Sequence, residues 1–226
     1  MTGTVLPDAN VLFSRTLRDW LFLLSSGGEL YTVHSTPDIL AETLSRYRDR
    51  FPHVTGEEFD RLETHLKEHL HSVFNHYKPR PCPIADEGDH HVHAAAEDGG
   101  MMYLVTADRG FLDLPEKVTD EFSYEITSPD DFFCLVDDSQ PALVCDVALR
   151  QLHYWSSKPS KPNLTLVDAL EKSGCPEFSR RVAKHLSQQL RIPIAGSRHH
   201  LKADANSLGV APDTEPALAP RSASPS

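Results

Sequence analysis

Two short apolar runs in this sequence each lead into an aspartate, and this arrangement constrains the fold more than any other feature. Residues 4–7 are followed directly by Asp8, and residues 101–106 are followed, after one alanine, by Asp108. Both runs are too short for a helix and have the length of a buried strand. Helical patterns lie between them, and strands that alternate with helices predict a parallel sheet covered by helices. Because ligands bind outside the carboxyl ends of parallel strands, we expect Asp8 and Asp108 to lie close together.

The chain that follows the first run carries clear helix signals. Apolar side chains at helical spacing predict a helix over residues 11–26, and a strand over residues 30–34 comes next. Residues 36–38, Thr-Pro-Asp, supply an N-cap, a first-turn proline and an acid for the following helix. Glu42 lies in that helix, close enough to the end of the preceding strand for its carboxylate to approach Asp8.

The middle of the chain predicts two more helices, and a further carboxylate stands at the start of the second. A capping box opens an amphipathic helix whose apolar spacing runs from Thr55 to about Tyr77. Asp89 then precedes a run of apolar side chains at helical spacing, which Gly99–Gly100 end. Beyond it, residues 124–127 are expected to form a strand.

The last third of the sequence has helical patterns without strand signals. We predict a first domain over residues 1–138, a helical extension over 139–195, and a flexible tail over 196–226, which is rich in Pro, Ala and Ser. Residues 158–162 are expected to form a linker, and residues 174–176 to separate two helices. The predicted fold class is α/β, with a parallel sheet flanked by helices and a small C-terminal helical extension.

Composition bounds the function without deciding it. The chain has 226 residues and 39% hydrophobic content, enough for a core, and no apolar run approaches the roughly 20 residues of a membrane span. We therefore expect a cytoplasmic protein with no membrane contact. The formal net charge of −11 disfavours a large basic face for nucleic acid. It does not exclude a nuclease, because a metal site concentrates carboxylates and local cations can contact phosphate, as Lys78, Arg80 and Arg109 could.

The cysteines and histidines do not form a recognisable zinc pattern. The four cysteines are scattered and contain no C-x-x-C pair, which argues against a zinc ribbon or a disulfide framework. Histidines do cluster, as His90, His91 and His93 and as His65 with His69, but no cysteine or ligand spacing accompanies them. A site built from carboxylates is the stronger expectation.

Four acids on these elements carry a resemblance to a known family. The chain resembles the PIN domain, and within it the VapC-type toxins of bacterial toxin–antitoxin pairs, over residues 4–136. The resemblance rests on four segments: Asp8-Ala9-Asn10-Val11-Leu12, Ile39-Leu40-Ala41-Glu42-Thr43, Asp89-His90-His91-Val92-His93-Ala94-Ala95-Ala96 and Val105-Thr106-Ala107-Asp108-Arg109-Gly110-Phe111. It implies a metal-dependent endoribonuclease on a PIN-like sheet, with RNA as substrate and a cognate antitoxin protein as partner. A homodimer of this chain is a further possible assembly.

The chemistry of the four acids agrees with this resemblance. Mg²⁺ and Mn²⁺ prefer oxygen ligands, so a carboxylate cluster can hold one or two such ions. A bound ion can lower the pKa of a water molecule and neutralise charge that develops on a phosphate. Asp8, Asp89 and Asp108 would be direct or water-mediated ligands, and Glu42 would bind a second ion or orient the water. Asn10 is expected to hydrogen-bond one of these ligands.

One position departs from the PIN pattern and keeps other functions open. Many relatives carry an extra aspartate where this chain has Gly110, and Asp86, Glu87 and Asp113 are the candidates to replace it. The alternative function is a catalytically inactive PIN-like module that binds RNA or takes part in assembly. An aspartyl-phosphate phosphatase is disfavoured, because it needs a second aspartate at the position of Asn10.

Each charged side chain also has an ordinary explanation. Asp89 could simply favour a helix N-terminus, and Asp8 and Asp108 could be solvated loop acids. Glu42 could be an exposed helix residue, and Arg109 either a contact to RNA phosphate or a surface cation. Because all four acids occur together, a shared metal site is favoured over these separate ordinary roles.

Overall fold

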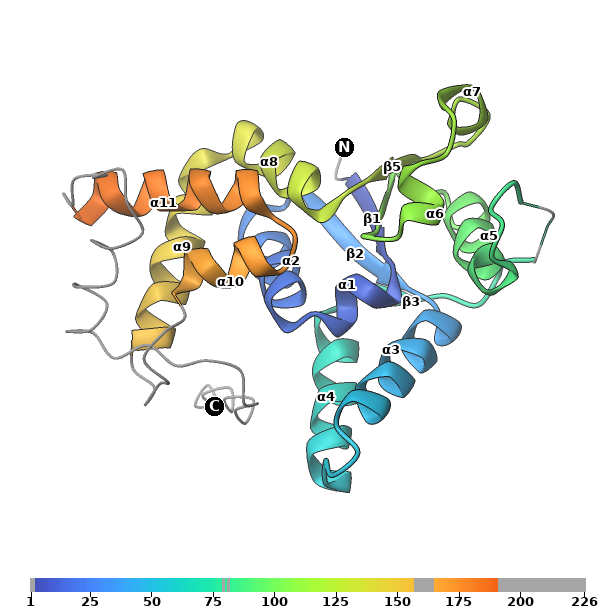
Figure 1. Cartoon of the computed structure of the whole chain (residues 1–226), viewed down its shortest axis with the longest axis horizontal. Coiled ribbons are helices and arrows are strands. Elements are labelled where there is room, and N and C mark those ends of the chain that lie inside the picture. Colours follow the sequence, from blue (N-terminus) through green and yellow to red (C-terminus); the bar gives the residue numbers. More distant parts are fainter. Residues whose placement is uncertain (1–2, 79, 81, 157–164, 191–226) are drawn as a thin grey trace, which may run out of the picture.

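A five-stranded parallel sheet forms the centre of the protein (Figure 1). The computed structural model describes residues 3–78, 80, 82–156 and 165–190. All strand pairs are parallel and the strand order is β3-β2-β1-β4-β5. The strands are β1 Gly3–Pro7, β2 Tyr31–Ser35, β3 Ser72–Val73, β4 Tyr103–Val105 and β5 Glu125–Thr127. The predicted α/β class with a parallel sheet is confirmed.

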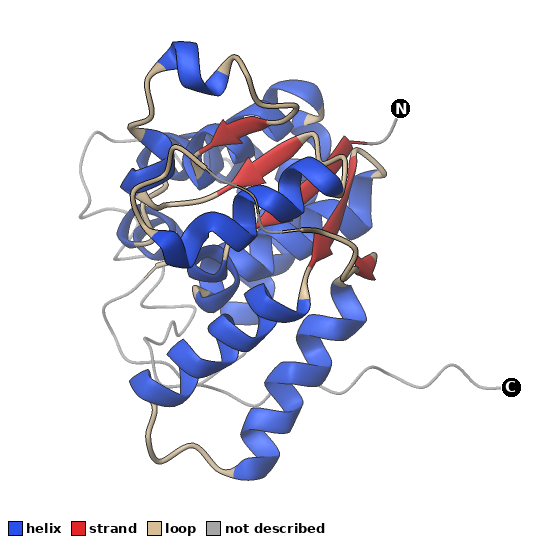
Figure 2. Ribbon diagram, turned by 90° about the vertical axis from the view of Figure 1, so that its right-hand side faces the viewer, coloured by secondary structure: helices blue, strands red, loops and turns tan. Residues whose placement is uncertain are grey.

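Helices cover the sheet on both sides (Figure 2). In Figure 1, α2 and α8 to α11 gather on one side of the strands and α5 lies on the other. No helix in the described part of the chain is long and apolar enough to cross a membrane. The helices are α1 Ala9–Phe13, α2 Arg15–Gly28, α3 Pro37–Arg50, α4 Gly56–His69, α5 His90–Asp98, α6 Arg109–Leu112, α7 Glu116–Thr119, α8 Pro129–Ser139, α9 Pro141–Ser156, α10 Leu166–Lys172 and α11 Pro176–Leu190, with a short 3-10 turn η1 at Glu87–Asp89.

The first helical region is divided in two, which the predicted single helix over residues 11–26 did not anticipate. Helix α1 ends at Phe13, and Ser14 adopts an extended conformation with φ −67° and ψ 111°. The Ser14 hydroxyl then accepts a hydrogen bond from the backbone N–H of Leu17 and caps α2. A serine that bonds the backbone in this way favours a helix start over a helix interior.

Helix α4 is shorter than predicted, and the chain after it forms the edge strand β3. The helix ends at His69 rather than near Tyr77, because the following backbone bonds to β2 instead. The N–H of His71 donates to Val33 O at 2.7 Å, and the N–H of Phe74 donates to Ser35 O at 3.0 Å. The apolar spacing that extended the prediction was misleading, since the side chain of Val73 is exposed.

The C-terminal helices pack against the sheet through α8. The ring of Phe132 on α8 contacts Tyr31 of β2 and Tyr103 of β4, with ring centroids 5.1 and 5.7 Å apart. Trp20 of α2 meets Phe178 of α11 edge to face, at 5.0 Å and 88°. The predicted helical extension is therefore confirmed as helices. The predicted linker at residues 158–162 and tail at 196–226 lie outside the described residues.

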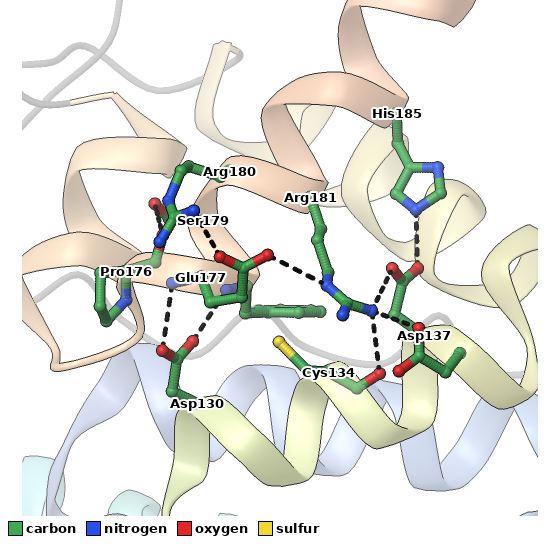
Figure 3. Close-up of polar contacts among 11 residues, drawn as sticks. Asp130, Cys134, Asp137, Pro176, Glu177, Ser179, Arg180, Arg181 and His185 are labelled. Carbon is green, nitrogen blue, oxygen red and sulfur yellow. Dashed lines mark hydrogen bonds and ion pairs between the residues drawn. The ribbon is translucent and has the colours of Figure 1, made fainter.

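Polar contacts fix α11 against α8 (Figure 3). The carboxylate of Asp130 on α8 accepts hydrogen bonds from the N–H groups of Glu177 and Phe178, at 3.1 and 2.8 Å, and so satisfies the start of α11. The guanidinium of Arg181 donates to Cys134 O at 3.3 Å, and His185 Nε2 lies 2.6 Å from Asp137 Oδ1. The two N–H groups that Asp130 binds belong to the start of α11, where a helix leaves its backbone donors unpaired, and the Arg181 and His185 contacts add further bonds between the two helices.

Candidate functional site

Asp8 stands at the carboxyl end of β1 and caps α1. Its carboxylate accepts hydrogen bonds from the N–H of Ala9 at 2.6 Å, from the Thr106 hydroxyl at 2.7 Å, and from the amide of Asn10. The residue is buried, and this burial raises the pKa of the Asp8 carboxyl, while the bonds from Thr106 and Ala9 oppose the rise. A buried carboxylate that still accepts several hydrogen bonds is held in one orientation.

Asn10 and Thr106 join the end of β1 to the end of β4. Asn10 Oδ1 accepts from the N–H of Ala107 at 3.1 Å, and the Thr106 hydroxyl accepts from the N–H of Asp108 at 3.0 Å. The Asn10 amide also donates to the Asp8 carboxylate, which is the hydrogen bond that we expected from Asn10. Thr106, which is fully buried, was not singled out from the sequence. Its only local signal is its place two residues before Asp108, at the end of a strand.

Asp89 lies at the junction of η1 and α5, and its pKa is affected by the charges of other acids. Its side chain makes no capping hydrogen bond. Burial, followed by the charges of Asp8, Asp108, Asp86 and Glu42, raises the pKa of Asp89 from 3.8 to about 6. A like charge nearby disfavours the ionised form of a carboxyl, and here it adds to the larger effect of burial. The charges of Asp8, Asp108, Asp86 and Glu42 therefore reach Asp89, and their joint role in one site stays a prediction.

Asp108 caps α6 directly after β4. Its Oδ1 accepts a hydrogen bond from the N–H of Gly110 at 2.6 Å. A Cβ atom at position 110 would lie 3.0 Å from that same oxygen, so glycine suits this tight turn. Of the candidates to replace the missing acid, Asp86 lies near Asp89, whereas Asp113 is exposed and pairs with Arg109 at 3.2 Å. Glu87 is exposed.

Glu42 on α3 faces the same region. Its Oε1 pairs with Arg46 at 2.6 Å, and its Oε2 lies 3.9 Å from Nε2 of His91. The charge of Glu42 also contributes to the raised pKa of Asp8. Glu42 is therefore part of the acidic site, and Arg46 offsets some of the repulsion it brings.

The acids offer the oxygen donors that a hard divalent cation prefers. The Asp89 side chain makes no capping bond, Asp108 Oδ1 accepts from the Gly110 N–H, and a carboxylate has about four lone-pair positions in all. The donor chemistry therefore fits Mg²⁺ or Mn²⁺. In the described part of the chain, however, no group of three or more His, Cys, Asp or Glu side chains converges closely enough to hold a metal ion.

The histidines that suggested zinc lie in two places, with the His65 and His69 rings 4.2 Å apart on α4 and the others on α5. His65 and His69 lie on α4, where the His69 ring stacks on Phe22 at 5.4 Å. His93 Nδ1 lies 2.8 Å from the Tyr124 hydroxyl, within the core. Burial, with the charge of neighbouring His69, lowers the pKa of His65 to about 3. These rings serve packing, whereas Nε2 of His91 lies 3.9 Å from Glu42 Oε2.

A separate cavity of about 510 Å³ lies between β5, α6 and α7. Its walls include Phe111, Leu114, Tyr124 and Ile126. None of the four acids lines it, so it is distinct from the acidic site.

Comparison with known proteins gives one match, in the C-terminal helices. Residues 129–184 match the family described as VapC50 C-terminal domain. The match begins at α8 and extends into α11, so it covers less than half of the chain and none of the four acids. It relates these helices to the VapC family of toxins. Searches of curated proteins and of solved structures found no match.

Proposed function

We propose that this protein is a metal-dependent endoribonuclease that hydrolyses RNA phosphodiester bonds, and that it is the toxin of a type II toxin–antitoxin pair. The observation that supports the proposal is that Asp8 and Asp108 follow β1 and β4, and that their charges and that of Glu42 act on Asp89. The VapC-related C-terminal helices support the same biological role. A PIN-like nuclease domain over residues 1–138 is part of the proposal.

We assign a separate role in metal binding or catalysis to each side chain from its contacts. Asp8, Asp89 and Asp108 would hold Mg²⁺ or Mn²⁺, which when bound supplies an activated water and neutralises phosphate charge. Asn10 and Thr106 orient Asp8 by donating to its carboxylate. Glu42 would orient the attacking water or contribute to a second cation position, with Arg46 holding its other oxygen.

A cleavage assay on the full chain tests this function. RNA would be incubated with the parent protein in Mg²⁺, in Mn²⁺ and in EDTA, alongside Asp89→Asn and the matched control Asp113→Asn, whose acid is exposed and paired with Arg109. We expect cleavage by parent and control only with metal. Asp89→Asn should lose more than about 100-fold, since even outer-shell partners of a metal site contribute about 10–100-fold. Cleavage by Asp89→Asn at the parent rate would refute the assignment.

A second function draws support from two observations at the same site. The acids do not converge into a ready metal group within the described residues, and Gly110 stands where the resemblance to the PIN pattern implies a further acid. The alternative is a PIN-like RNA-binding or assembly module that does not cut. RNA binding measured in the same samples separates the two, because binding without any cleavage in Mn²⁺ would favour the module.

The proposed role also implies partners. A toxin of this type would be neutralised by a cognate antitoxin, and a homodimer is the proposed self-association. Co-expression with the product of an adjacent small open reading frame should yield a stable complex that no longer cleaves RNA. Light scattering of the purified chain measures the homodimer independently.

A further inference from the structure

The cavity beside β5 lies at the edge of the sheet. Strand β5 is the last in the order β3-β2-β1-β4-β5, so within the described chain a strand pairs with only one of its sides (Figure 1). Glu125 and Ile126 of this strand line the cavity, together with residues of α6 and α7. Successive side chains of a strand point to opposite faces of the sheet. Because both residues line the cavity, it runs along the open edge of β5.

The backbone of β5 directs one donor and one acceptor toward this edge. The N–H of Glu125 donates to Met102 O at 2.9 Å, and Thr127 O accepts from the N–H of Thr106 at 3.1 Å, so Glu125 and Thr127 bond toward β4. In a parallel ladder, the residue between two such residues turns its N–H and C=O to the opposite side of the strand. Ile126 therefore presents both groups to the open edge, where an added strand would bond to them.

Apolar side chains form much of the cavity wall. They include Phe111, Leu114, Phe122 and Ile126, and also Met102, which is 45% exposed. The volume of about 510 Å³ lies within the range of about 300–1,000 Å³ that is typical of ligand sites. Covering apolar surface contributes about 25 cal/mol per Å², so a partner that fills the cavity gains free energy beyond the few hydrogen bonds of a short edge strand.

Three acids accompany these apolar walls and restrict the chemistry of the occupant. Glu116, Asp120 and Glu125 line the cavity and are exposed. None of them takes part in an ion pair among the described residues. Their charge attracts cations and repels phosphate, which argues against nucleic acid or an anionic membrane. It also argues against a second copy of this chain, because pairing two β5 edges would bring like charges together.

We propose that the open edge of β5 and its cavity bind an extended peptide segment of a partner protein, in which apolar and basic side chains alternate. The segment adds a strand beside Ile126, places apolar side chains in the cavity and pairs its cations with the three exposed acids. An alternating pattern suits the site because successive side chains of the added strand point in opposite directions. This interaction is independent of the proposed function, since none of Asp8, Glu42, Asp89 and Asp108 lines the cavity.

Titration of the full chain with a synthetic peptide tests the chemistry of the partner. The probe is a short peptide with capped ends in which isoleucine alternates with arginine, and fluorescence polarisation follows its binding. We expect saturable binding that weakens at least about tenfold when serine replaces isoleucine, because the apolar contribution is lost. The peptide with glutamate in place of arginine should not bind. Absence of binding by the isoleucine–arginine peptide, or equal binding of all three peptides, would overturn the proposal.

A pair of charge reversals shows whether the peptide binds at this edge. Asp120→Lys should weaken binding by at least about tenfold, because it places a like charge beside the cations of the peptide. Glu121→Lys is the matched control, since the adjacent acid is also exposed but does not line the cavity. Equal effects of the two variants would show that net charge alone explains the binding.

Hydrogen exchange of single amides, measured by nuclear magnetic resonance, tests the added strand. The N–H of Glu125 is already bonded to Met102 O, whereas that of Ile126 faces the open edge. Saturation with the isoleucine–arginine peptide should slow exchange at Ile126 by at least about tenfold and leave Glu125 nearly unchanged. Peptide binding without protection of Ile126 would overturn the proposal. Protection of Ile126 that grows with protein concentration in the absence of peptide would identify a second copy as the occupant and would overturn it too.

Discussion

Replacing Asp89 by asparagine should stabilise the metal-free protein at neutral pH. In the folded chain, burial and the surrounding acids raise the pKa of Asp89 to about 6 from the ordinary value of 3.8, a shift of about two units. Each unit corresponds to about 1.4 kcal/mol, so the ceiling on the penalty is about 3 kcal/mol. Asp89 is partly exposed, and solvent screening reduces this to about 1–2 kcal/mol. Asparagine at this position carries no charge and avoids the penalty.

The same shift fixes how the difference depends on pH. Because the pKa of Asp89 is raised in the folded state, the folded protein binds this proton more tightly than the unfolded chain does. The stability that this proton contributes is fully present below pH 3.8 and is lost as the pH rises through about 6. The stability advantage of Asp89→Asn should therefore be small near pH 4 and largest above pH 7.

Urea denaturation in EDTA, on parent and Asp89→Asn at both pH values, measures this advantage. The control Asp113→Asn, whose acid lies on the surface beside Arg109, should change little. A variant less stable than the parent at pH 7.5, or an advantage that does not grow with pH, would refute the reasoning that the four acids repel one another.

Three further predictions follow from individual contacts. Mn²⁺ at 100 times its dissociation constant should add about 2.7 kcal/mol to the free energy of unfolding of the parent and so raise its melting temperature. Asp89→Asn should shrink this gain, and an unchanged parent melting temperature would count against a metal site. Thr106→Val should lower cleavage by about 10–100-fold through loss of the bond to Asp8, with unfolding monitored by urea, and wild-type activity would contradict it. Asp130→Ala should cost about 1–2 kcal/mol of stability by removing the cap of α11, whereas Asp146→Ala, which breaks an exposed pair, should cost less; equal costs would exclude the capping role.

Local sequence patterns predicted the parts of the fold that depend on local chemistry. The strand before Asp8 and the strand before Asp108 were predicted because short apolar runs bury well in a parallel sheet. The start of α3 was predicted because Thr36 and Pro37 specify a helix N-terminus, and the Thr36 hydroxyl does accept from the N–H of Ile39. Such signals do not depend on the rest of the molecule.

The parts that were missed depend on pairing between distant segments. Strand β3 has two residues, and only its bonds to β2 end α4 at His69. Thr106 joins the site because β4 lies beside β1, which brings its hydroxyl to Asp8. The approach of His91 to Glu42 likewise depends on the turn at Gly88, whose carbonyl oxygen lies 2.6 Å from Nδ1 of His91. No periodicity in the chain encodes these contacts.

The role of the four acids remains a prediction, and the metal dependence of cleavage tests it most directly. The rate of RNA cleavage by the full chain would be measured across a Mn²⁺ series, and Mn²⁺ binding would be measured by calorimetry under the same conditions. We predict that the half-saturating concentration for cleavage coincides with the dissociation constant, and that Asp8→Asn loses both binding and cleavage. Cleavage that persists in EDTA, or that Asp8→Asn retains in full, would contradict a metal-dependent site built from these acids.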